Sequence, residues 1–154
     1  MLKFENTIMI QRPIHEVFNF LADFTNIPKW NYYVLEVRQI SEGPIQEGTA
    51  FHQVRKTDEQ TFRVIAYQPN QELVVKTIAG DSPQFEIKFD LIKENGSTRL
   101  VDEWVLDTGQ PAILERLALG KIRSAVADNL AKLKELLETG KTTLQDGRIV
   151  RLSP

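Results

Sequence analysis

One carboxylate stands out among the side chains that could do chemistry. Asp102 lies on a β-strand predicted over residues 98–107, where strict alternation places it on one face with Leu100, Trp104 and Leu106. Because the other members of that set are large and apolar, we expect this face to look into the protein. A carboxylate on such a face is costly unless it is paired, hydrogen-bonded or protonated, which makes Asp102 the first candidate for a functional residue.

A cation that could meet this carboxylate comes from a strand predicted over residues 49–56. There Phe51, Gln53 and Arg55 share a face by the same alternation, so Arg55 is a candidate partner for Asp102. A polar pair inside an apolar cup would fix the polar end of a ligand. Two alternatives stay open: a structural ion pair near the rim of the sheet, or a face assignment that is wrong by one residue and turns these side chains to solvent.

Other chemistries are excluded or disfavoured by residue type and spacing. The chain has no cysteine, which excludes disulfides, thiolate metal sites and cysteine nucleophiles. His15 and His52 are far apart and lack neighbours at ligand spacing, so we predict no metal. The chain has no Gly-x-Ser-x-Gly motif, and the loop containing Gly43 and Gly48 lies between strands beside carboxylates, unlike a phosphate cradle. We therefore predict no cofactor.

Length and charge place the chain among ordinary small globular proteins. Its 154 residues suit one domain, and the net charge of −2 argues against bulk binding to nucleic acid. No run of apolar residues approaches the roughly 20 that a membrane span needs, so we do not expect the chain to be an integral membrane protein. Lys3, Glu5 and Asn6 stand where a signal peptide needs an apolar block, and a cytoplasmic location is the default expectation.

A β pattern covers most of the first two thirds of the chain. Alternation predicts a strand over residues 2–10, and the segment after residue 32 carries the same period up to residue 107. The turns between these strands are short, and Asn95-Gly96 suits the positive φ angles of a hairpin, so we expect an antiparallel meander. The six further strands are predicted near residues 33–40, 49–56, 60–68, 72–79, 84–93 and 98–107.

Helical spacing replaces the β pattern in two places. A short amphipathic helix is predicted over residues 14–22, opened by Pro13, and a second helical turn near residues 26–30. After Pro111, apolar residues recur every three or four positions and predict a long amphipathic helix that stops at Gly140. Gly120 is a candidate break that would separate an approach segment, residues 112–119, from the main helix. Together with the strands, these elements give an α+β fold.

The first half of the long helix is rich in small residues, whereas its second half is bulky. Small side chains that face a curved sheet leave volume open, so we expect a cavity near residues 111–126, with Ile122 on its helical wall. Ile113, Leu114 and Leu117 on the approach segment would then form part of a lid. The small residues are Ala118, Gly120, Ser124, Ala125 and Ala127.

The last residues are polar and short. We assign residues 1–140 to the domain and interpret residues 141–154 as a polar C-terminal tail. The alternative is a further hairpin turning at Asp146-Gly147, a dipeptide that suits a tight turn.

Three segments resemble a known superfamily. They are Arg12–Asp23 (RPIHEVFNFLAD), Asn26–Asn31 (NIPKWN), and Glu42-Gly43-Pro44 leading to Gly48–Phe51 (GTAF). Together they resemble the polyketide cyclase/dehydrase and lipid-transport superfamily, also called SRPBCC, START-like or birch-pollen-allergen-like proteins. The similarity extends over residues 1–138. It implies a helix-grip fold, in which a seven-stranded curved antiparallel sheet wraps around a long C-terminal helix, with two short helices between the first and second strands.

The resemblance also implies a cavity for an apolar or amphipathic molecule. In the matched motif Trp30 docks back on the fold, either at the cavity entrance or as core packing, and the Tyr33 hydroxyl either faces a ligand or is half exposed. Combined with the strand faces, this gives a candidate ligand-binding set of Trp30, Tyr33, Phe51, Gln53, Arg55, Asp102, Trp104, Leu117 and Ile122.

Three functions remain open at this point. We prefer non-enzymatic binding or carriage of a small hydrophobic or amphipathic molecule, because no convincing catalytic set is present. The alternative enzyme is a cyclase/dehydratase acting on an enolisable ring precursor, with Asp102 as acid/base and Arg55 or a tyrosine hydroxyl steadying an enolate. The third is a protein-interaction regulator that docks through the basic residues of the tail. An exposed sheet edge can pair with a second copy of the chain, so a homodimer is a further alternative.

Overall fold

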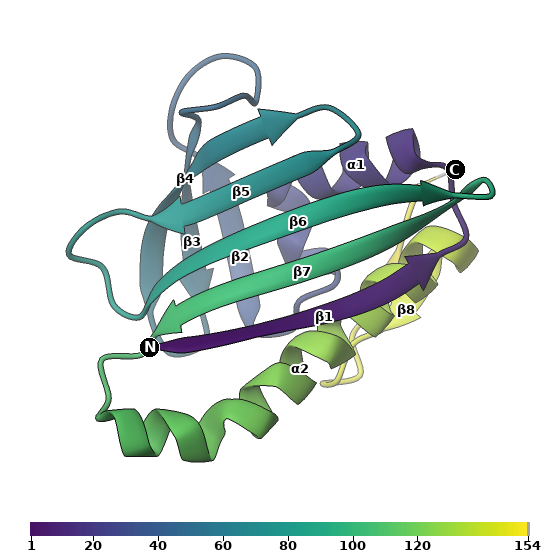
Figure 1. Ribbon diagram of the computed structural model, residues 1–154. Coiled ribbons are helices and arrows are strands. Elements are labelled where there is room, and N and C mark those ends of the chain that lie inside the picture. Colours follow the sequence, from purple (N-terminus) through teal and green to yellow (C-terminus); the bar gives the residue numbers. More distant parts are fainter. Residues whose placement is uncertain (154) are drawn as a thin grey trace.

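A seven-stranded antiparallel sheet is the main structural element of the computed structural model, which describes residues 1–153. The strands run as a meander from the second to the seventh, and the first strand pairs with the seventh (Figure 1). The strand limits agree with the sequence prediction to within two residues. They are β1 (Leu2–Ile10), β2 (Val34–Gln39), β3 (Ala50–Arg55), β4 (Glu59–Gln68), β5 (Glu72–Thr77), β6 (Gln84–Glu94) and β7 (Ser97–Asp107).

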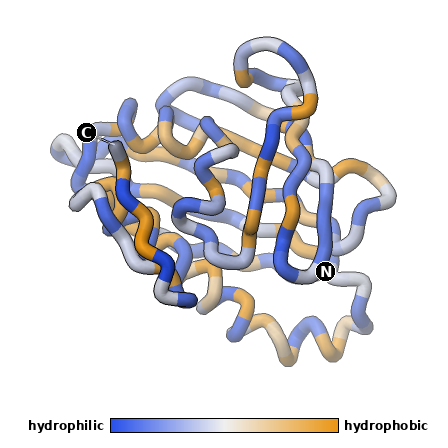
Figure 2. The backbone as a smooth tube through the Cα atoms, turned by 180° about the vertical axis from the view of Figure 1, so that it is seen from behind, coloured by the Kyte–Doolittle hydropathy of each residue, from blue (hydrophilic) through white to orange (hydrophobic). Residues whose placement is uncertain are grey.

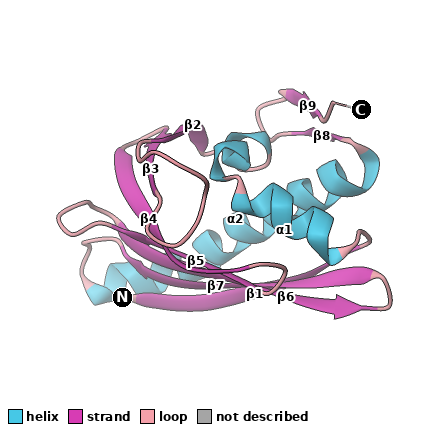
Figure 3. Cartoon of the chain, turned by 90° about the horizontal axis from the view of Figure 1, so that it is seen from above, coloured by secondary structure: helices cyan, strands magenta, loops and turns pink. Residues whose placement is uncertain are grey.

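The helices lie on one side of the sheet, which bends around them (Figure 3). Between β1 and β2 come α1 (Ile14–Ala22) and the 3-10 helix η1 (Phe24–Lys29), as predicted. The long helix α2 (Ala112–Thr139) follows β7 and packs against β1. This arrangement confirms the predicted α+β architecture of a curved sheet around a C-terminal helix.

α2 is one continuous helix, so the predicted break at Gly120 is wrong. A glycine inside a helix costs only about 1 kcal/mol relative to alanine, which the rest of a 28-residue helix offsets. The predicted end is correct, because Gly140 caps α2 with a φ of 80° and donates its N–H to Leu136 O at 2.8 Å. The left-handed conformation of this cap is the one that glycine adopts without a steric penalty.

The sheet faces follow the predicted alternation. Along the tube in Figure 2, apolar and polar residues alternate on the strands. On β7, Leu100, Asp102 and Leu106 are buried and Trp104 is half-buried, and Phe89 of β6 lies opposite Asp102 in the register. The inward face predicted for Asp102 is therefore correct, and the alternative of a one-residue error is excluded.

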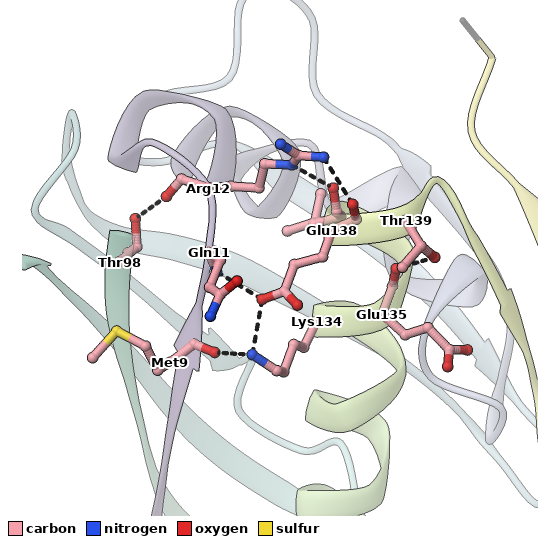
Figure 4. A network of polar contacts seen from close by, with 9 residues as sticks. Met9, Gln11, Arg12, Thr98, Lys134, Glu135, Glu138 and Thr139 are labelled. Atoms are coloured by element: carbon pink, nitrogen blue, oxygen red, sulfur yellow. Dashed lines mark hydrogen bonds and ion pairs between the residues drawn. The ribbon is translucent and has the colours of Figure 1, made fainter. Parts of the chain in front are cut away.

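A polar cluster fixes the C-terminal end of α2 to the corner between β1 and α1 (Figure 4). The guanidinium of Arg12 donates to Leu137 O at 2.9 Å and to Glu138 O at 2.8 Å. The Glu138 carboxylate accepts from the backbone N–H of Gln11 at 2.7 Å and from Lys134 Nζ at 2.8 Å. The last carbonyls of the helix thus receive cationic donors, which also suit the negative end of its dipole.

Residues 141–151 form an ordered hairpin, so their interpretation as a tail is wrong and the hairpin alternative is correct. The hairpin pairs β8 (Lys141–Thr143) with β9 (Ile149–Arg151). Leu144 is 2% exposed, and Gln145 Nε2 donates to Asn129 Oδ1 on α2 at 3.3 Å. Leu144 is the only apolar residue from 141 to 148, and it is buried where the hairpin lies against α2.

Candidate functional site

A pocket of about 520 Å³ lies between the inner face of the sheet, η1 and the middle of α2. Its size falls within the range of small-molecule sites. Its walls are mostly apolar, because the inward-facing residues of β4 to β7 meet a helical stripe at three- and four-residue spacing. The main apolar wall residues are Phe24, Ile27, Phe62, Val75, Phe85, Ile87, Phe89, Leu106, Ile122, Ala125 and Val126.

Asp102 is the most unusual polar residue in this wall. It is only 2% exposed, and its Oδ1 has no hydrogen-bond partner among the described residues. Burial raises the pKa of the Asp102 carboxyl to about 7, and the nearby indole N–H of Trp104 offsets part of this rise. Trp104 Nε1 itself is buried without a hydrogen-bond partner in residues 1–153, so the indole acts here as a nearby dipole rather than through a formed bond.

Arg55 is not the partner of Asp102, which corrects the predicted pair. Its Nε lies 3.1 Å from Oδ1 of Asp58, three positions along the chain at the turn between β3 and β4. Three strands separate β3 from β7 in the sheet. Alternation predicts which face a side chain occupies, but not how far apart two residues on that face are. Arg55 does line the pocket, at the side opposite to β7, and the predicted ion pair at the rim therefore exists with a different acid.

Gln53 forms the second buried polar contact on that side. Its Nε2 donates to Gln60 Oε1 at 3.2 Å, and both side chains are buried. Gln60 faces Gln53 directly in the β3–β4 register. Gln53, the member of this pair that lines the pocket, therefore gives this side of it an uncharged polar group.

Seven of the nine predicted ligand-binding residues line the pocket. Trp30 is 7% exposed and belongs both to the wall and to the hydrophobic core, so the two predicted roles for it are not exclusive. Tyr33 is 41% exposed and packs on Tyr32 with ring centroids 4.5 Å apart. The seven are Trp30, Tyr33, Gln53, Arg55, Asp102, Trp104 and Ile122.

Phe51 and Leu117 lie outside the pocket wall, contrary to the sequence prediction. Phe51 is fully buried and packs on Phe24 and Phe62, with ring centroids 5.3 and 5.4 Å away, and these two rings form the wall instead. Leu117 is 78% exposed, as are Ile113 and Leu114 to 68% and 48%, so the predicted lid segment faces away from the pocket. In Figure 1 the first turns of α2 extend beyond the sheet, which is consistent with the exposure of these apolar side chains.

Sequence reasoning missed Asn129, a buried polar residue of the helical wall. Asn129 is 4% exposed, lines the pocket, and accepts its hydrogen bond from the hairpin residue Gln145. The signal was present, since Ile122, Val126 and Asn129 fall at four- and three-residue spacing on one helical face. A polar residue on an otherwise apolar stripe marks this position in the same way as Asp102 on β7.

Residues 1–153 contain neither a helix suited to span a membrane nor a metal-binding cluster. None of the described helices is both long and apolar enough to cross a membrane. Within the same residues, His, Asp and Glu side chains do not gather in groups of three that could hold a metal ion.

Comparison with known proteins places this geometry in a family. Residues 1–138 match the family described as polyketide cyclase / dehydrase and lipid transport. A search of curated protein sequences gives no match.

Several solved structures have the same fold at low sequence identity. A protein from Thermus thermophilus is 14% identical with a TM-score of 0.67, and the alignment covers 89% of this chain and 94% of that protein. CalU16 from Micromonospora echinospora is 17% identical with a TM-score of 0.63, covering 89% and 76%. The di-domain ARO/CYC BexL, from the BE-7585A biosynthetic pathway, is 15% identical with a TM-score of 0.66, covering 88% of this chain and 47% of BexL. Since the family match spans residues 1–138 and the fold agrees with it, the chain belongs to the polyketide cyclase/dehydrase and lipid transport (SRPBCC) family.

Proposed function

We propose that this protein binds or carries a small hydrophobic or amphipathic molecule in the pocket between the sheet and α2. The observation that supports this most directly is the volume of about 520 Å³ behind apolar walls, in a position where a packed core would bury its own side chains. The family description, which includes lipid transport, is consistent with such a ligand.

The distribution of polar groups favours an amphipathic molecule over a pure hydrocarbon. Asp102 and Trp104 lie on the β7 side of the pocket, whereas Gln53 and Arg55 lie on the β3 side. Aromatic and aliphatic side chains of β4 to β6 separate these two ends. A few polar groups at the ends of an apolar space fix the orientation of a ligand without a large cost of desolvation.

Intrinsic fluorescence tests this proposal, because both tryptophans of the chain line the pocket. A panel of fatty acids, isoprenoids, flavonoids and aromatic alcohols should contain compounds that change the emission in a saturable manner. The variant Ala125→Phe places a ring inside the pocket wall and should weaken binding at least tenfold. Its matched control is Ala131→Phe, on an exposed position of the same helix, which should bind as the parent does.

The proposal fails if no compound of the panel gives a saturable change, or if Ala125→Phe and Ala131→Phe behave alike. Circular dichroism of both variants shows whether they fold, so that a loss of binding is not confused with a loss of structure.

A second candidate function is catalysis on an enolisable ring, and the Asp102 carboxyl favours it. A pKa of about 7 lets this group donate or accept a proton near neutral pH, which general acid–base catalysis requires. Trp104 Nε1 is a free donor beside it among the described residues, whereas Arg55 is held by Asp58. The name ARO/CYC of BexL, a relative in fold, is consistent with this chemistry.

Asp102→Asn separates the two candidates. Asparagine keeps the shape of the side chain but cannot take up or release a proton, so an enzyme would lose turnover while still binding its substrate. Product analysis by mass spectrometry after incubation with enolisable polyketide-like compounds provides the measurement. Recovery of every bound compound unchanged from the parent protein would contradict catalysis and leave binding in place.

A further inference from the structure

Two neighbouring atoms of the pocket wall, Asp102 Oδ1 and Trp104 Nε1, are buried without a hydrogen-bond partner among residues 1–153. The residues are two positions apart on β7 and therefore lie side by side on its inner face. One atom is an acceptor of the carboxyl group, and the other is an N–H that can only donate. Buried polar groups in native proteins are nearly always satisfied, so an adjacent unpaired acceptor and donor call for an explanation.

Several polar side chains of the surrounding region have partners within the chain. Asn6, which faces Asp102 on β1, donates to the carbonyl of Arg123 at 3.3 Å. The hydroxyl of Thr108 donates to Glu115 Oε2 at 2.8 Å, and Asn129 accepts from Gln145. The chain therefore provides partners for these three groups, whereas the buried Asp102 Oδ1 and Trp104 Nε1 are left for something that enters the pocket.

Packing holds the donor of this pair in place. The Trp104 ring stacks on Phe4 with centroids 5.7 Å apart and lies 6.0 Å from the ring of Phe85. Phe89 lies opposite Asp102 in the β6–β7 register and lines the same pocket. A ligand group that reaches the two polar atoms thus meets a preorganised donor, with apolar walls around it.

We propose that Asp102 and Trp104 form a subsite for the hydroxyl group of an uncharged, otherwise apolar ligand. The inference rests on the proposed ligand-binding function and specifies the chemical class of the ligand. A hydroxyl group donates to Asp102 Oδ1 and accepts from Trp104 Nε1 at the same time. When Asp102 is ionised, an ether or ketone oxygen can satisfy only the indole, and a ligand carboxylate would bring a second negative charge beside Asp102.

The same geometry explains why a hydroxyl would be preferred even where water can enter. A water molecule that bridges the two atoms makes the same donor and acceptor contacts. A ligand hydroxyl reproduces these bonds when it displaces the water, whereas a methyl ether or a bare hydrocarbon loses one or both of them.

Matched ligands of one shape test the subsite. The compounds are 2-naphthol, 2-methoxynaphthalene, which only accepts, and naphthalene, which does neither. Their dissociation constants are measured by isothermal titration calorimetry on the whole chain above pH 7, where Asp102 is ionised. We expect 2-naphthol to bind about tenfold more tightly than 2-methoxynaphthalene, as one additional hydrogen bond provides.

Two variants locate this preference. Asp102→Leu removes the acceptor at similar volume and should reduce the preference for 2-naphthol over 2-methoxynaphthalene to less than threefold. Trp104→Phe removes the donor that both oxygen compounds use, so it should keep this preference but remove the advantage of 2-methoxynaphthalene over naphthalene. Tyr32→Phe, the matched control, removes a polar group from an aromatic ring outside the pocket wall and should change neither comparison. Thermal unfolding shows which variants fold, and Trp104→Phe still tests the donor if Asp102→Leu does not fold.

The outcomes distinguish the subsite from the function on which it rests. Equal affinities of the parent protein for 2-naphthol and 2-methoxynaphthalene would overturn the hydroxyl subsite while leaving ligand binding intact. A preference between them that survives in Asp102→Leu, or an unchanged advantage of 2-methoxynaphthalene over naphthalene in Trp104→Phe, would do the same. Failure of all three compounds to bind would overturn both the subsite and the proposed pocket function for ligands of this class.

Discussion

At the scale of single residues, Asp102 shows how a folded chain can hold a carboxyl group in an unfavourable place. The inner face of β7 buries it among apolar side chains, and Arg55, the cation predicted to meet it, is bound to Asp58. The neutral acid is therefore favoured up to about pH 7, whereas an aspartate in the unfolded chain loses its proton near pH 4. This difference makes the stability of the protein depend on pH.

The sign of that dependence follows from proton uptake. Between about pH 4 and pH 7 the folded state keeps the Asp102 proton and the unfolded state has released it, so stability falls as pH rises. The contribution is on the order of 4 kcal/mol across this range. We expect urea unfolding at a series of pH values to show this decrease in the parent relative to Asp102→Asn, which has no such proton to lose.

The comparison between the two proteins is essential, because other carboxylates act in the opposite direction. The amine of Met1, with the backbone N–H and hydroxyl of Thr108, holds the pKa of Glu115 down to about 2, so this group adds stability as pH rises above that value. A stability difference between parent and Asp102→Asn that stays constant from pH 4 to pH 7 would contradict the assignment of Asp102.

At the scale of elements, polar contacts anchor α2 at both of its ends. Glu115 accepts from Thr108 near the beginning, and Arg12 donates to the carbonyls of the last turn. Its middle, between Ile122 and Asn129, forms the wall of the pocket. Because both ends of α2 are anchored, the middle of the helix can border the open pocket even though its own side chains do not fill that space.

The two halves of α2 should respond differently to the same substitution. Leu133 is fully buried, so Leu133→Ala should cost about 2–5 kcal/mol of unfolding free energy through lost burial and an added cavity. Leu117 is 78% exposed, and Leu117→Ala should change stability by less than about 0.5 kcal/mol. Chemical denaturation of both variants checks this. A large loss of stability in Leu117→Ala would indicate that the first turns of α2 are covered in solution.

The C-terminal hairpin contributes to the pocket as well as to stability. Removal of residues 141–154 exposes the surface that Leu144 covers, a burial worth about 1.5–3 kcal/mol for a leucine. It also releases the side chain of Asn129, which Gln145 holds against the pocket. We expect the shortened chain to melt at a lower temperature and to bind pocket ligands more weakly.

A matched control separates these two effects. Gln145→Ala removes the contact to Asn129 but keeps the hairpin and Leu144, so it should weaken binding with little change in melting temperature. Equal binding by the shortened chain and the parent would show that the hairpin is irrelevant to the pocket.

At the scale of the whole molecule, the sheet, η1 and α2 enclose one volume, so a ligand there stabilises the entire fold. At a concentration 100 times its dissociation constant, a ligand that binds only the folded state adds about 2.7 kcal/mol. For a domain of this size the melting temperature should rise by roughly 5–10 °C. Differential scanning calorimetry provides the measurement, and Ala125→Phe should abolish the rise while Ala131→Phe keeps it. A parent protein that melts at the same temperature with and without a saturating ligand would refute this coupling.

Sequence periodicity was sufficient to predict most elements of this protein and the face on which each side chain lies. The alternation of β7 placed Asp102 and Trp104 inside, and the three- and four-residue spacing placed Ile122 on the helical wall. These predictions succeed because a strand or helix has a fixed geometry that depends only on neighbouring residues. The superfamily resemblance then indicated how the elements are joined.

The tertiary structure alone decided which of these side chains meet. Arg55 pairs with Asp58 rather than Asp102 because the breadth of the sheet separates β3 from β7. Phe51 packs on Phe24 and Phe62, which form the pocket wall in its place, and Leu117 is exposed. The apparent tail is a hairpin in which Leu144 is buried. Each of these outcomes depends on sheet curvature and on contacts between segments far apart in the chain, which a local period does not contain.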